Sequence, residues 1–178
     1  AEAGGGGAWT QISSQTASAD ATIDFTTLSA DYRDFKVIAS GINVSAAGDM
    51  WFRVDAGSGF VTSSDYVFAI TGHDSGGVAS NNGSGAGALN FTLCYHGWDE
   101  AAAYNGAMQV TVYDVHNTTN YKLMHGEYDY WDNVHEITCG VGSCSMKAAT
   151  TAITGLRFQP ATGNFATGEF TLYGRKIT

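Results

Sequence analysis

Hydrophobic and polar residues alternate along most of the chain with a period of two. In "AMQVTVYD" (107–114), Met108, Val110 and Val112 share one face, opposite Gln109 and Thr111. Successive side chains of a β-strand point to opposite faces of the sheet, so this pattern predicts half-buried strands. Similar apolar or alternating runs predict strands over residues 21–25, 35–44, 50–55, 65–70, 89–95, 107–114, 121–128, 134–139, 155–158 and 169–174.

The spacing of these runs predicts the fold class. Clusters of Gly, Asn, Asp and Ser separate the runs and mark turns. The only hint of helix is "DEAAAY" at 99–104, which is enough for about one turn. The chain contains one proline, Pro160, as expected where proline would remove ladder hydrogen bonds. We therefore expect an all-β protein, an antiparallel β-sandwich of about eight to ten strands.

Composition narrows the possible partners. The net charge is −9 with only 8 basic residues, which argues against nucleic-acid binding and against attraction to anionic membranes. No apolar run approaches the ~20 residues that span a bilayer, so membrane insertion is not expected. Charged residues make up 14%, so Ser, Thr, Asn and Gly must form much of the surface, which suits a rigid extracellular or virion protein. "GGGG" at 4–7 predicts a flexible linker over residues 1–7 and a single domain over 8–178.

The motif "GHDSGG" (72–77) is similar to the sequence around a trypsin-like nucleophile. No histidine precedes His73, which is only two residues from Ser75, whereas a triad draws its members from distant parts of the chain. We interpret residues 71–87 as a long Gly/Ser/Asn connection between strands. No catalytic residue and no cofactor is expected.

Three cysteines leave one pairing open. Cys139 and Cys144 frame "CGVGSC", whose glycines would let the chain fold back into a short disulfide loop, with Cys94 unpaired. The alternative is three free, mostly buried thiols. No C-x-x-C pair is present, which argues against zinc.

Two polar and aromatic clusters are candidates for function, "CYHGWDEAAAY" (94–104) and "EYDYWDNVHE" (127–136). Sugar rings stack their C–H faces on flat aromatic rings, and their hydroxyls need carboxylate, amide or imidazole partners. The clusters therefore predict a glycan-binding site on loops. Its candidate residues are Trp98, Asp99, Tyr104, Asp129, Tyr130, Trp131, Asp132 and His135.

Other interpretations of the same clusters remain open. Large aromatic residues most often fill a core or a subunit interface. Glu127 and Asp129 share a strand face by their spacing, so a glycosidase pair is a less favoured alternative. Asp and Asn oxygens are plentiful, but no EF-hand loop is present, and a metal site is left open.

The ends of the chain show a family resemblance. The segment "ITGLRFQPATGNFATGEFTLYGRK" (153–176) resembles the closing strands of tailed-bacteriophage virion proteins, and residues 8–45 are similar to their opening strands. Gene-transfer-agent head spikes carry similar modules. The resemblance implies a jelly-roll-like β-sandwich, often trimeric, at the end of a fibre or on a capsid, with its variable loops in 73–106 and 125–147.

Two functions follow as expectations from this resemblance. The first is a non-enzymatic virion surface domain, at the tip of a tail or head fibre or spike, that binds host cell-surface glycan. It would form a homotrimer and join other virion proteins through its N-terminus. The second is a decoration or cement protein that stabilises the particle without binding a receptor.

Overall fold

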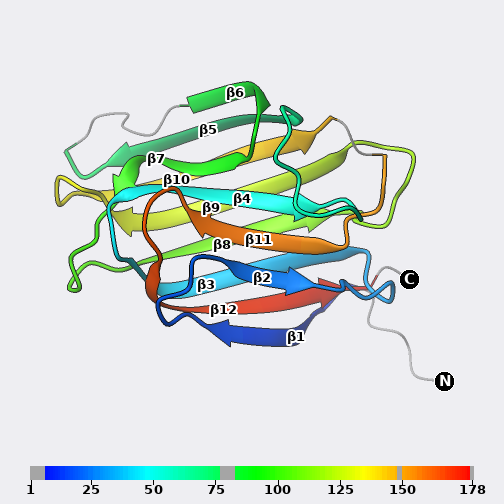
Figure 1. The fold of residues 1–178 in the computed structure, drawn as a ribbon, viewed down its shortest axis with the longest axis horizontal. Coiled ribbons are helices and arrows are strands. Elements are labelled where there is room, and N and C mark those ends of the chain that lie inside the picture. Colours follow the sequence, from blue (N-terminus) through cyan, green and yellow to red (C-terminus); the bar gives the residue numbers. More distant parts are fainter. Residues whose placement is uncertain (1–6, 77–82, 148–149, 177–178) are drawn as a thin grey trace.

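The computed structural model describes residues 7–76, 83–147 and 150–176, and within them it contains β-strands and no helix (Figure 1). The predicted linker over residues 1–7 lies outside the described residues apart from Gly7. The twelve strands are β1 (Trp9–Thr16), β2 (Ile23–Thr26), β3 (Asp34–Val44), β4 (Gly48–Asp55), β5 (Tyr66–Asp74), β6 (Gly83–Ala88), β7 (Phe91–Trp98), β8 (Gly106–Tyr113), β9 (Lys122–Trp131), β10 (Ile137–Met146), β11 (Gly155–Pro160) and β12 (Phe165–Arg175).

The strands form two antiparallel sheets packed face to face, which confirms the predicted all-β sandwich. The larger sheet has the order β1-β12-β3-β8-β9-β10-β5-β6 and the smaller one the order β2-β11-β4-β7. The chain passes repeatedly from one sheet to the other between β2 and β12, which is the wrapping of a jelly roll. The meander β8-β9-β10 widens the larger sheet, and the strand count therefore exceeds the expected eight to ten.

The core lies between the two sheets and follows the predicted alternation. Met108, Val110 and Val112 of β8 are buried, as are Phe52 and Val54 of β4. Aromatic pairs connect the two sheets, such as Phe158 of β11 and Phe170 of β12, whose ring centroids lie 5.6 Å apart. This continuous apolar layer is the main source of stability for the domain.

Several local predictions were wrong. The stretch 99–104 forms a turn rather than a helical turn. The chain from 137 to 146 forms the long central strand β10, and residues 83–88 form β6. Both segments are rich in glycine, which hides the period-two pattern because glycine has no side chain to alternate. Within the described residues of the variable regions 73–106 and 125–147, more residues therefore lie in strands than in turns.

The two ends of the sandwich differ in what they present. Trp9, at the start of β1, pairs with Arg175 near the end of β12. The first strand therefore begins, and the last strand ends, at the same end of the large sheet. The β9–β10 turn, residues 132–136, lies at the opposite end of the sheet (Figure 1, left). Most of the candidate site residues lie around this turn.

Candidate functional site

Four of the eight predicted glycan-binding residues are buried, so their predicted contact with a ligand is wrong. Trp98 is 1% exposed, Asp99 3%, Tyr130 2% and Asp132 1%. A side chain with so little accessible surface cannot stack on or hydrogen-bond a sugar in this conformation. The other four, Tyr104, Asp129, Trp131 and His135, are half-buried or exposed.

Trp98 is a core residue at the end of β7. Its ring stacks on Tyr130, with centroids 4.8 Å apart and an interplanar angle of 18°, and its Nε1–H donates to the Ile42 carbonyl at 3.3 Å. Gly106 makes room for it, because a Cβ there would lie 2.2 Å from Trp98 Cζ2. A buried indole needs such a hydrogen-bond acceptor, and here the backbone supplies it.

Asp132 organises the turn between β9 and β10. Its Oδ1 accepts the backbone N–H groups of Val134 and Glu136, both at 3.0 Å, and its Oδ2 accepts the Thr138 hydroxyl at 3.3 Å. A short carboxylate that caps nearby amides is typical of Asx turns. The position of Asp132 is thus explained by the turn without a ligand.

Asp99 holds the neighbouring turn, and His135 lies over it. Asp99 Oδ1 accepts the Ala101 N–H at 2.7 Å. Its buried Oδ2 has no well-aligned hydrogen bond, although His135 Nε2 lies 3.2 Å away. His135 adopts a left-handed backbone conformation, with φ 66°.

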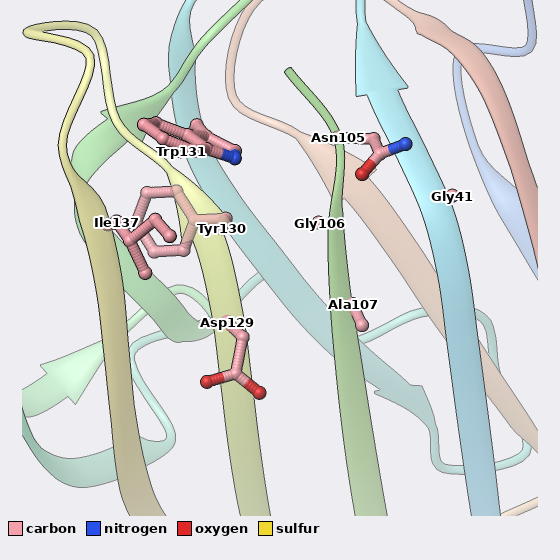
Figure 2. Close-up of a pocket in the computed structure, with 8 residues that line it drawn as sticks. All are labelled: Gly41, Asn105, Gly106, Ala107, Asp129, Tyr130, Trp131 and Ile137. Atoms are coloured by element: carbon pink, nitrogen blue, oxygen red, sulfur yellow. The ribbon is translucent and has the colours of Figure 1, made fainter. Parts of the chain in front are cut away.

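A groove of about 280 Å³ lies beside this turn, on the outer face of the large sheet (Figure 2). Trp131 and Ile137 border it on the side of β9 and β10, while Asn105 lies across from them (Figure 2). Its lining residues come from four segments and are Gly41, Asn105, Gly106, Ala107, Asp129, Tyr130, Trp131 and Ile137.

Strand alternation explains which predicted residues reach the groove. Along β9, Tyr128 and Tyr130 face the core, so Asp129 and Trp131 face outward. Ala107 pairs with Asp129, and Trp131 pairs with Ile137, which places small and apolar side chains next to the indole and the carboxylate. The composition of 127–136 predicts one loop cluster, whereas β9 divides its residues between an inward and an outward face.

An aromatic stack supports Trp131, which lines the groove. The Tyr104 ring lies 5.1 Å from the Trp131 ring at an interplanar angle of 27°, and 5.0 Å from the His135 ring at an angle of 41°. Three rings from two turns therefore support each other. Such mutual packing holds Trp131 in one orientation before any ligand arrives.

Sequence reasoning missed the floor and the far side of the groove. Nothing in the sequence marks the other lining residues as part of a binding site, and these are Gly41, Asn105, Gly106, Ala107 and Ile137. The small side chain of Ala107, which points outward from β8, helps to leave the space open. Only the pairing of β3, β8 and β9 brings these residues beside Trp131.

Of the two alternatives for the cysteines, the structure has the free thiols and no bond between Cys139 and Cys144. Both residues lie on the extended strand β10 with free thiols, Cys139 exposed and Cys144 buried. Five positions along a strand span about 16 Å and reverse the side-chain direction, which no disulfide can bridge. Burial raises the pKa of Cys144 to about 12, and the same cause raises that of Cys94 to about 12.

Other chemistries find little support in the part of the chain that the structure describes. No group of three or more His, Cys, Asp or Glu could hold a metal ion there. Asp129 is the only carboxylate among the residues that line the groove. Ser75 follows β5, and its backbone N–H donates to the Ile137 carbonyl at 2.9 Å. No helix of the described residues is long and apolar enough to cross a membrane.

Comparisons with known proteins supply no family. No family model matches the chain, and no curated protein matches it. Among solved structures, a chain from the "Structure of infectious bursal disease virus Gt strain" aligns at 10% identity, over 93% of this chain and 42% of that chain, with a TM-score of 0.14. This score is too low to carry an argument about fold or function.

Proposed function

We propose that the protein is a non-catalytic carbohydrate-binding domain of a phage-like virion surface, and that it binds glycan in the groove beside Trp131. The observation that carries the proposal is the groove itself. It combines a preoriented indole with a small apolar floor and two polar groups, Asp129 and Asn105. Small-ligand sites are concave and mostly apolar, with a few placed polar groups.

The position of the groove supports a role in attachment. Trp131 lies at the end of the sheet opposite Trp9, where the first strand begins (Figure 1). A domain tethered to a particle at its N-terminus would then present the groove outward. The virion location and the homotrimer rest on the sequence resemblance of residues 8–45 and 153–176.

Binding is favoured over hydrolysis by the carboxylates near the groove. Glycosidases use two carboxylates on either side of the bond. Asp129 lines the groove, whereas Glu127, the other member of the predicted pair, lies outside its lining and accepts a hydrogen bond from Gln109 Nε2 at 2.9 Å. A single stacked sugar would bind weakly, with a Kd on the order of 1 mM, and several copies on a particle would raise the avidity.

The experiment is a glycan array with the purified domain, followed by titration of the best neutral oligosaccharide. Trp131→Ala should abolish binding, and Trp9→Ala, which removes a half-buried indole at the other end of the sheet, should leave it unchanged. Equal binding by both variants would contradict the proposal.

One observation favours the alternative role as a decoration or cement protein. Ile38, Leu123 and Val141 lie on the outer face of the large sheet with exposed fractions of 42%, 60% and 45%. Aliphatic side chains on one face are typical of surfaces that pack against another subunit. Light scattering would show whether Val141→Glu dissociates an assembly of the protein. If it does, and if Trp131→Ala leaves particle attachment intact, the cement role is favoured over glycan binding.

A further inference from the structure

The outer face of the small sheet carries two arginines on directly paired positions. Arg53 of β4 and Arg157 of β11 are Cα partners, and like charges placed opposite each other destabilise a sheet. Asp24 of β2 offsets one of them, because its two oxygens accept Arg157 Nε at 2.8 Å and Nη2 at 2.6 Å. The second positive charge needs a separate explanation.

Arg53 is exceptional among the four arginines. Its Nη1 donates to Gln159 Oε1 at 2.7 Å, and its Nε donates to the Leu89 carbonyl at 3.4 Å, so both acceptors are neutral. The other three arginines, Arg33, Arg157 and Arg175, each lie within 4.0 Å of a carboxylate. Arg53 has no such ion pair within residues 7–76, 83–147 and 150–176, in a chain with a net charge of −9.

The surroundings disfavour the charge on Arg53. Partial burial lowers the pKa of its guanidinium, and the charge of Arg157 lowers that pKa further, while Tyr66 acts in the opposite direction. For the neighbouring Arg157 the opposite holds, because the hydrogen bonds that it donates to the Asp24 carboxylate raise its pKa. An added anion at Arg53 would therefore relieve an unfavourable arrangement.

The indole ring of Trp51 lies next to the Arg53 guanidinium. Trp51 lies two residues before Arg53 on the same face of β4, half-buried, with its ring centroid 5.2 Å from the Arg53 guanidinium carbon. Gln159 pairs with Trp51 across the sheet and carries an amide. The guanidinium of Arg53, the amide of Gln159 and the indole of Trp51 thus lie close together on one face of the small sheet. We call this surface the Arg53 patch (Trp51, Arg53, Arg157 and Gln159).

We propose that the Arg53 patch is a binding site for an acidic saccharide. The guanidinium of Arg53 pairs with a carboxylate or sulfate of the sugar, and the sugar ring stacks on Trp51. Guanidinium groups match the geometry of such oxyanions through paired N–H donors. The site lies on the opposite sheet from the Trp131 groove, and it does not depend on the function proposed for that groove.

The test follows the Trp51 indole N–H by NMR while the wild-type domain is titrated with glucuronate, glucose 6-sulfate, glucose and inorganic sulfate. We expect the two charged sugars, or one of them, to shift this signal in a saturable and salt-sensitive way. Glucose and inorganic sulfate should bind more weakly by about tenfold or more, the effect of one charged hydrogen bond. Equal affinity for inorganic sulfate, or no shift with either charged sugar, would overturn the proposal.

Variants separate this site from the groove. Arg53→Gln should weaken the binding of the charged sugar by about tenfold or more. Arg33→Gln removes the same charge from a guanidinium that already faces Asp34 and Asp114, and it should have no effect. Trp131→Ala should also leave acidic-sugar binding intact, so failure at one site is distinguishable from failure at the other. If Arg53→Gln does not fold, the wild-type titration still decides.

Discussion

Trp98 and Tyr130 stack on each other inside the core, whereas Trp131, the next residue along β9, faces outward and lines the groove. Two tryptophans with similar sequence surroundings thus have opposite roles. The difference arises because one occupies an inward position of its strand and the other an outward position. It leads directly to different expectations for their substitution.

Trp98→Ala should destabilise the fold by about 3–5 kcal/mol, because it empties a large buried volume and removes a stacked ring. Trp131→Ala should cost less, about 1–2 kcal/mol, since its side chain is half-buried. Urea unfolding followed by circular dichroism measures both values. A larger loss for Trp131→Ala would mean that Trp131 is the structural residue.

Gly106→Ala should destabilise the domain by about 2 kcal/mol or more through overpacking. The added Cβ would lie 2.2 Å from Trp98 Cζ2 and 2.6 Å from the Asp129 carbonyl oxygen, and the backbone atom cannot move aside easily. Gly57→Ala is the matched control, because its surroundings are open and only its φ of +91° is unfavourable. That control should cost about 1 kcal/mol. Thermal melts measure both variants, and a higher melting temperature for Gly106→Ala than for Gly57→Ala would contradict the prediction.

A thiol reagent at pH 8 should label one cysteine of the native protein, Cys139. Its side chain is exposed on β10, whereas Cys94 and Cys144 are buried, with pKa values raised to about 12 by burial. Thiolates are the reactive form, so the buried pair should remain protonated and unreactive. Intact mass spectrometry should show one adduct when folded and three in urea. Loss of labelling in reducing-agent-free buffer would instead indicate a disulfide.

Stability should fall as the pH rises from about 9 to 12. The buried thiols of Cys94 and Cys144 keep their protons up to about pH 12, while in the unfolded chain thiols lose them near pH 9. The folded state then binds more protons, so the free energy of unfolding decreases with pH, by up to about 3 kcal/mol per unit for two thiols. Urea midpoints measured across this range test the slope. Cys144→Ala should flatten it, and Cys139→Ser should not.

The sequence alone determined the fold class, because period-two alternation in segments such as 107–114 forces one side of each strand into a core. It also located the neighbourhood of the candidate site, since Asp129 and Trp131 were both identified. It was misleading where glycine removed the alternation, because the glycines of 139–144 allowed a short disulfide loop, whereas these residues lie on the strand β10.

Only the tertiary structure decided which aromatic residues are available to a ligand. Trp98 and Trp131 have equally polar neighbours in sequence, and their burial depends on what packs above them. The space for Trp98 comes from Gly106, a residue of another strand, and Trp131 is supported by Tyr104, which lies in the connection between β7 and β8. The Arg53 patch arises in the same way, because Arg53 and Arg157 are 104 positions apart in the numbering (157 minus 53) and meet only through strand pairing. Such contacts depend on which strands become neighbours, and local alternation carries no information about that choice.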